Sequence, residues 1–349
     1  MSGDNLTFNH SRAFTVWLLE NKCSIVISCY RKHKLFCLGV QGNGEVSTYF
    51  LNTLRPMGLV AHNNMLISSS LGNITTYVAD SDENHKEWGY FDSIYRPTHV
   101  YLSADSDVHD LRIDPATSSI YYVSALFNCI CTPSTTKSFN VYWTPPWITK
   151  DKHGNPPCED RCHLNGMALF EGKPRFVTAC CISDYHQAWR EHQGEGVVYD
   201  ILEETIVAHG LWAPHSPNWY RNQLWIAEAG TGQFGYVDLD TRKFVPKKFV
   251  PGFIRGITFF KNFALVNTSM DRHDVAFKDI PLGDILQKEN RSVRAGVHVI
   301  DMDTPGLDIK HWFEFLDPKT ELYDIACIEN TRRIRILETN ELKSDKFYL

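Results

Sequence analysis

The sequence has little that would tie it to a membrane or to a nucleic acid. No apolar run approaches the roughly 18 residues that a helix needs to cross a bilayer. Lys and Arg number 35 against 41 Asp and Glu, which gives a net charge of −6, and no basic stripe of the kind a nucleic-acid binder carries is present. Residues 1–9 lack the basic-then-apolar pattern of a secretion signal. We therefore expect a cytoplasmic protein without nucleic-acid or membrane partners, and the oligomeric state stays undetermined.

The ten cysteines lack the paired Cys-x-x-Cys spacing of a structural zinc site. Most lie in apolar, strand-like runs such as CSIVISC and FNCIC, so we expect buried free thiols. Cys158, Cys162 and His163 form one cluster compatible with a metal ion, but two thiolates alone are a weak signal.

Helical periodicity is also scarce, and residues 11–20 and 281–288 are the best helix candidates. Short runs rich in Val, Ile, Phe, Tyr and Thr recur instead, bounded by Gly, Asn, Asp and Pro. Alternating strand–helix units are absent, which excludes a doubly wound α/β fold. The chain is therefore predicted to be all-β.

Six segments repeat one pattern: a polar or small residue, an apolar strand, a polar turn and a second apolar strand. Their anchors lie 39 to 69 residues apart, close to or above the roughly 40–50 residues of a four-stranded propeller blade. The anchors are Gly58, Asp110, Gly166, Pro217, Gly256 and Ile325. We predict a six-bladed β-propeller; the alternative is a large β-sandwich or two smaller β domains.

The two ends of the chain are predicted to share one blade. Strands between residues 23 and 51 precede the first repeat, whereas the sixth repeat is short of strands. Closure by both ends leaves no bare sheet edge. Residues 1–349 then form one propeller domain, with a short N-terminal extension over residues 1–12.

The positions just ahead of the anchors carry the candidate site, because the innermost strands of a propeller converge at the mouth of its channel. Three histidines, His109, His163 and His215, precede consecutive repeats. Imidazole is a common ligand of zinc, iron and copper, so we predict a divalent transition metal held by these three. Bound water or substrate would complete the metal's coordination. A metal-free acid–base site and a purely structural ring of hydrogen bonds are the alternatives.

Further polar residues at the repeat starts complete this prediction. Arg255 suits a carboxylate or phosphate of the substrate. Asp324 is expected as a ligand, an orienting group or a base, and Asn165 as a catalytic neighbour; Asp110 is a further candidate ligand. Arg55 opens the first repeat and is a candidate substrate contact.

Residues 184–196 form a polar insertion that contains aromatic residues in the third repeat. Long loops on rigid scaffolds often cover a site. Trp189 and Arg190 are candidate substrate contacts, and the alternative is a solvated loop without a role.

Several strings resemble one family. RPMGL, VHDL, EDRCHLNGMAL, APHSPNW, PGFIRGI and ELYDI occur here in this order. They are similar to a mostly bacterial family known only as conserved hypothetical proteins with a domain of unknown function. The resemblance implies a six-bladed propeller related to the gluconolactonase and strictosidine synthase group, without naming a reaction. The related lactonases hold calcium through oxygen ligands, so the imidazoles argue against a calcium lactonase.

The leading hypothesis is a metal-dependent hydrolase or lyase that acts on a small anionic substrate at the channel mouth. Hydrolase or lyase is preferred only by analogy with other propellers. An iron- or copper-dependent oxidoreductase at the same ligands is the first alternative. A non-catalytic ligand sensor or an interaction scaffold is the second.

Overall fold

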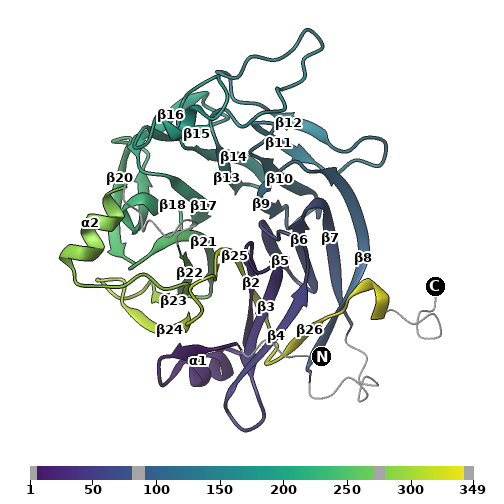
Figure 1. Ribbon diagram of the computed structural model, residues 1–349, viewed down its shortest axis with the longest axis vertical. Helices are drawn as coiled ribbons and strands as arrows, with labels where there is room; N and C mark the ends of the chain where they lie inside the picture. Colours follow the sequence, from purple (N-terminus) through teal and green to yellow (C-terminus); the bar gives the residue numbers. More distant parts are fainter. Residues whose placement is uncertain (1–5, 81–90, 271–279, 342–349) are drawn as a thin grey trace.

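Six small β-sheets lie in a ring around a central channel in the computed structural model, which confirms the six-bladed propeller (Figure 1). The structure describes residues 6–80, 91–270 and 280–341. Within these ranges, no helix has the length and apolarity needed to cross a bilayer.

Each blade consists of four antiparallel strands, counted here from the channel outward. Blade 1 contains β5 (Leu59–His62), β6 (Met65–Ser70), β7 (Gly72–Asp80) and β8 (Ser93–Ala104). Blade 2 contains β9 (Val108–Ile113), β10 (Ile120–Ser124), β11 (Cys129–Thr132) and β12 (Asn140–Trp143). Blade 3 contains β13 (Leu164–Phe170), β14 (Lys173–Ala179), β15 (Gly196–Asp200) and β16 (Thr205–Leu211). Blade 4 contains β17 (Pro214–Tyr220), β18 (Gln223–Glu228), β19 (Gln233–Asp238) and β20 (Lys243–Phe249). Blade 5 contains β21 (Phe253–Phe260), β22 (Phe263–Ser269), β23 (Gly296–Asp301) and β24 (Ile309–Phe315).

Blade 6 is built from both ends of the chain, as predicted. Its innermost strand is β25 (Leu322–Glu329), and its outer strands are β2 (Cys23–Cys29), β3 (Lys34–Val40) and β4 (Val46–Asn52). β25 pairs antiparallel with β2, with Ile325 opposite Ile27. This pairing closes the ring without leaving an innermost strand unpartnered.

Two blades gain a fifth strand from the ends of the chain. β1 (Phe8–His10) lies in the N-terminal extension and pairs with β24 of blade 5. β26 (Ile334–Ile336) pairs in parallel with the first residues of β8 in blade 1. The described part of the extension is therefore packed into the propeller.

Helices are few, as the sequence indicates. α1 (Phe14–Asn21) buries Phe14 and Leu18 in the core beside blades 5 and 6. It ends at Lys22, whose left-handed conformation lets its N–H reach the last carbonyls. α2 (Pro281–Lys288) begins with proline, whose missing N–H is not needed there. Short 3₁₀ turns are η2 (Ala188–Arg190), η3 (Ala229–Thr231) and η4 (Thr339–Glu341).

The core lies between neighbouring blades. Every residue of β2 is buried, because blades 1 and 5 cover its two faces. Such strands read as continuous apolar runs rather than as alternating patterns. Where blades meet at the channel there is little space: a Cβ added at Gly256 would lie 2.8 Å from the Asp324 Cα.

Candidate functional site

In five of the six blades, the innermost strand has a β-bulge near its start, at the residues of the candidate site. In β9, Val108 and Asp110 pair with the consecutive residues Ser124 and Val123, so His109 is the extra residue. Bulges bend a strand and redirect a side chain. The residues at or just before the starts of all six innermost strands are Met57, His109, Asn165, His215, Arg255 and Tyr323.

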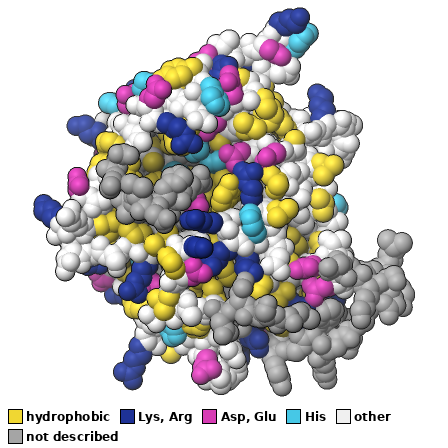
Figure 2. Space-filling model, viewed as in Figure 1, with side chains coloured by type: hydrophobic (Ala, Val, Ile, Leu, Met, Phe, Trp, Pro, Cys, Tyr) yellow, Lys and Arg dark blue, Asp and Glu magenta, His cyan; other side chains and the backbone are white. Residues whose placement is uncertain are grey.

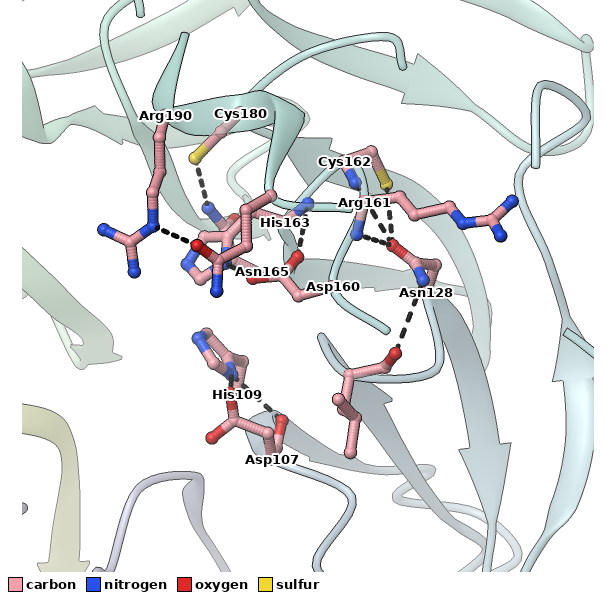
Figure 3. Close-up of polar contacts among 12 residues, drawn as sticks. Asp107, His109, Asn128, Asp160, Arg161, Cys162, His163, Asn165, Cys180 and Arg190 are labelled. Carbon is pink, nitrogen blue, oxygen red and sulfur yellow. Dashed lines mark hydrogen bonds and ion pairs between the residues drawn. The ribbon is translucent and has the colours of Figure 1, made fainter. Parts of the chain in front are cut away.

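Two of the predicted histidines lie against each other. The His109 and His163 ring centroids are 4.7 Å apart, with the planes at 89°. His109 Nδ1–H donates to the Asp107 carbonyl at 2.9 Å, and His163 Nδ1–H donates to the Asp160 carboxylate at 2.6 Å (Figure 3). Each ring is therefore oriented through Nδ1, and its Nε2 is the atom left for chemistry.

The third predicted histidine, His215, is hydrogen-bonded to Arg255. His215 Nδ1–H donates to the Ala213 carbonyl at 2.9 Å, so its Nε2 carries a lone pair and accepts from Arg255 Nη1 at 3.0 Å. The Arg255 guanidinium lies 4.7 Å from the Phe253 ring centroid and 5.2 Å from that of Tyr323. Residues of blades 4, 5 and 6 thus contact one cation, two of them through aromatic rings.

Tyr323 joins the two halves of the site. Its ring lies 5.5 Å from that of His109 in an edge-to-face arrangement. A continuous line of contacts therefore runs from His215 through Arg255, Tyr323 and His109 to His163. We call these five residues the mouth layer. Histidine, acidic and basic side chains gather near the middle of the face shown in Figure 2.

Burial and charge decide the protonation of this layer. Burial lowers the pKa of His109 to about 4, partly opposed by Asp107. Burial, together with the nearby Arg255 charge, also lowers the pKa of His215. Burial alone would raise the pKa of Asp160, but the charge and hydrogen bond of His163 outweigh it, and the pKa is lowered. His109 and His215 are therefore neutral at pH 7, and Asp160 is ionised.

The predicted loop reaches the mouth layer through one residue. Trp189, in η2, stacks on His163 with a centroid distance of 4.3 Å and an interplanar angle of 30°. Its indole Nε1–H is buried and has no hydrogen-bond partner among the described residues. Arg190 lies over the outer face of Trp189 at 4.3 Å and donates to Gln187 at 3.0 Å. The loop thus supplies the site with an unused hydrogen-bond donor.

Deeper in the channel lies a second set of polar residues, Asp110, Arg112 and Asp324, which we call the inner layer. Asp110 accepts from the Met167 N–H of blade 3 at 2.8 Å, and Asp324 accepts from the Leu59 N–H of blade 1 at 2.8 Å. Each carboxylate therefore fastens its own blade to the next one. Burial raises the pKa of both acids, and the charge of Asp110 raises that of Asp324 further.

Arg112 links several blades in this inner layer. Its Nη1 lies 2.7 Å from Asp110 Oδ1, and its Nε and Nη2 donate to the carbonyls of Met167 at 3.2 Å and Pro217 at 3.4 Å. Asp324, predicted as ligand or base, thus lies in this inner layer with both carboxylate oxygens bonded to backbone N–H groups.

Two further predicted residues make contacts outside the mouth layer. Asn165 is buried and bonds within its own blade, to the Thr178 hydroxyl at 2.6 Å and the Cys180 sulfur at 3.5 Å. Arg55 lies at the edge of the site and pairs with Asp107 at 3.5 Å, which in turn holds His109.

No group of three His, Cys, Asp or Glu side chains within the described ranges is arranged to hold a metal ion. His215 differs from the other two histidines because Arg255 occupies its Nε2. All ten cysteines are free, and eight are buried, as expected; Cys158 is exposed whereas Cys162 is buried. The three-histidine metal site therefore stays a prediction.

The sequence did not point to three residues of the site: Asp160, which orients His163, Tyr323 of the mouth layer and Arg112 of the inner layer. Asp160 was detectable, since it precedes His163 by three residues. Tyr323 was hidden because the sixth anchor lies one residue too late, at Ile325; a shift to Asp324 puts Tyr323 level with His109. Arg112 gives no signal in the repeat pattern.

Together, the fold and site define a six-bladed β-propeller whose channel mouth is lined by imidazoles, a guanidinium and aromatic rings. The chain belongs to the family described as "Domain of unknown function (DUF4915)", which matches residues 12–337. A comparison with the curated proteins finds no match.

Solved structures with a similar fold have little sequence identity to this chain. A chain of the nidogen/laminin complex is 11% identical, covers 88% of this chain over 99% of its own length, and gives a TM-score of 0.51. A computationally designed protein, Ika8, is 11% identical, covers 86% of this chain over 76% of its own, and gives a TM-score of 0.36. At this identity, the nidogen/laminin likeness concerns the fold alone.

Proposed function

We propose that the protein is an enzyme that binds a small anionic substrate at the channel mouth and transfers a proton through His163. The observation that carries this proposal is the 2.6 Å contact between His163 Nδ1 and the Asp160 carboxylate. A carboxylate on Nδ1 fixes the tautomer and stabilises the imidazolium, so that Nε2 works as a general base. Asp160 also accepts the His163 backbone N–H at 3.0 Å, which holds both residues in one geometry.

Arg255 is the proposed anchor for the substrate's anionic group. His215 holds the guanidinium in place without neutralising it, because a neutral imidazole accepts a hydrogen bond and carries no charge. A guanidinium can grip a carboxylate or phosphate through two N–H groups. The unused Trp189 Nε1–H is a further donor for the same ligand.

A metal-dependent form of this proposal has its own supporting observation. All three histidines are oriented through Nδ1, as metal-ligating histidines usually are. Zinc, iron or copper at Nε2 of His109 and His163 would activate water, and iron or copper would also permit oxidation. His215 could join these ligands only by giving up its contact with Arg255.

The proposed base is compatible with two reaction classes, hydrolysis and elimination. Hydrolysis and elimination both need a base that removes a proton from water or from carbon, which is the role given to His163. The likeness to gluconolactonase and strictosidine synthase and a bacterial origin belong to the same proposal and rest on the motif resemblance. A cytoplasmic location stays an expectation from the sequence.

The test begins with full-length protein purified without chelators, in which metal content is measured and small lactones, esters and hydroxy acids are assayed for turnover. Asp160→Asn should lower kcat by about 100-fold or more while the fold is kept. Tyr185→Phe is the control, since Tyr185 lies in the loop that carries Trp189 but bonds to Glu191 and His192 and not to the mouth layer.

The outcomes separate the candidate functions. One metal per chain that is lost in His163→Gln supports the metal-dependent form. Saturable anion binding without turnover would replace the enzyme by a sensor. Full activity in Asp160→Asn, or neither binding nor turnover, would contradict the proposal and favour a scaffold.

A further inference from the structure

A groove lies on the outer part of the propeller between blades 4 and 5, away from the channel mouth. Its volume is about 800 Å³, and its walls include Lys248 and Phe249 from β20, His298 from β23, and Trp312 from β24. Arg291, which follows α2, also lines the groove. Figure 1 shows α2 at the rim of the ring beside these two blades. The groove has the size of small-molecule sites, which commonly measure about 300–1,000 Å³.

The aromatic wall of the groove has an unengaged ring. Trp17, Trp219 and Trp225 each stack against or meet another aromatic ring. The Trp312 indole, by contrast, makes no ring contact or side-chain hydrogen bond within the described part of the chain. Its backbone is fixed by Ser11 on one side and by its pairing with His298 on the other. β24 therefore holds Trp312 in a fixed position in the groove lining, where no other described aromatic ring contacts its indole.

The charges of the groove are unbalanced in favour of cations. Both acidic residues on its walls already have basic partners: Asp308 pairs with Lys310 at 3.2 Å and Glu314 with Arg294 at 3.0 Å. The Lys248 ammonium donates only to the Gly306 carbonyl, at 3.2 Å, among the described residues. For Arg291 no side-chain ion pair or hydrogen bond occurs within the same ranges. Two cations thus face the groove without a carboxylate.

His298 adds a neutral polar side chain to the lining of the groove. It is buried, and burial lowers its pKa to about 4, so it carries no charge at pH 7. One of its ring nitrogens, Nε2, lies 3.3 Å from the Thr268 hydroxyl. His298 therefore contributes an uncharged polar part of the lining, whereas Lys248 and Arg291 contribute positive charge.

We propose that this groove binds a free nucleoside polyphosphate, with the base on Trp312 and the phosphates on Lys248 and Arg291. Stacking on an indole favours a planar heterocycle, and unpaired Lys and Arg side chains favour phosphate. A long nucleic acid is disfavoured because the whole chain carries a net charge of −6. This inference is independent of the function proposed for the channel mouth.

The test is calorimetric titration of the full chain with ATP, adenosine, tripolyphosphate and a short single-stranded oligonucleotide. ATP should bind at least about tenfold more tightly than adenosine or tripolyphosphate, because only ATP engages both the ring and the cations. Lys248→Ala/Arg291→Ala and Trp312→Ala should each weaken ATP binding by about tenfold or more. Lys247→Ala is the matched control, because Lys247 lies over Tyr236, outside the groove lining.

A second variant separates this groove from the mouth. Arg255→Gln should leave ATP binding unchanged, and thermal unfolding shows whether each variant is folded. The proposal is overturned by ATP that does not bind, by ATP binding that needs Arg255, or by equal binding in the double variant. Tripolyphosphate that binds as tightly as ATP would remove Trp312 from the site, and a tighter oligonucleotide would replace the proposed ligand class.

Discussion

His109 and Asp110 are neighbours on β9, yet they belong to two different layers of the same channel. In the inner layer, Asp110 accepts the Met167 N–H and pairs with Arg112, so its oxygens are committed to holding blades together. In the mouth layer, His109 uses Nδ1 to fix its ring and makes no described hydrogen bond through Nε2. A β-bulge separates the two roles by one residue.

The innermost strands of this closed ring therefore supply both the side chains that stabilise the fold and the side chains of the candidate site. Buried polar groups stabilise a fold when all their bonding capacity is used. A functional group must instead keep one polar atom available, usually at some expense of stability. Substitutions in the inner layer should therefore change unfolding, and substitutions in the mouth layer should change binding or turnover.

The largest expected effect on stability is that of Arg112→Leu. This substitution leaves the Asp110 carboxylate without its cation and removes the hydrogen bonds that Arg112 donates to three carbonyls, those of Leu111, Met167 and Pro217. Removal of one partner of a buried ion pair destabilises by about 3–5 kcal/mol. Urea unfolding measures the change. Arg221→Ala, at an exposed pair with Asp303, is the control and should lose less than about 1 kcal/mol.

A loss in Arg112→Leu no larger than in Arg221→Ala would show that the inner layer does not hold the blades together. The proposed structural role of the inner layer would then be wrong.

A smaller effect is expected for Asp324→Asn, and it depends on pH. Asp324 has a pKa raised by burial from 3.8 to about 7, so the folded state binds its proton more tightly than the unfolded state. Its contribution to stability is complete below about pH 4 and declines as pH rises toward 7. The asparagine variant should show a shallower decline over this range in urea midpoints measured at several pH values. An unchanged slope would mean that Asp324 does not titrate there.

The smallest effect on stability is expected for a substitution of Trp189, which stacks on His163 of the mouth layer. Trp189→Phe keeps a ring against His163 and removes a buried N–H that has no described partner. The free energy of unfolding should change by less than about 1 kcal/mol, since no hydrogen bond is lost. Ligand affinity at the mouth should fall. A large loss of stability would show instead that Trp189 is a structural residue.

Much of the fold was predictable because blades repeat, and repeats show in a single sequence. The short sixth repeat also indicated that residues 23–51 complete its blade, and β25 pairs with β2 accordingly. The site was predictable only in part. The spacing suggested that His163 occupies the same position as His109 and His215, but Asn165 does, and His163 reaches the mouth from the preceding loop. A one-residue bulge cannot be located in an apolar strand such as LYDIACIE, so Tyr323 was missed.

In the inner layer, Asp110 and Asp324 were predicted as site residues, but their role in joining blades and the contribution of Arg112 were not predictable, for a related reason. Both faces of a blade are covered by the neighbouring blades, as the packing of blade 6 against blades 5 and 1 illustrates, so polar alternation does not mark the residues that turn toward the channel. Arg112 therefore reads as an ordinary strand arginine, although it bonds to Met167 and Pro217 in two other blades.

If the two layers differ as described, the mouth layer binds a small anion and the inner layer does not. Crystals soaked in selenate distinguish the layers, because the anomalous signal of selenium locates the anion. We expect selenate within hydrogen-bond distance of the Arg255 guanidinium and His163 Nε2, and no selenate there in Arg255→Gln. Selenate that never enters the mouth, or that occupies it equally in Arg255→Gln, would show that the mouth layer is not an anion site.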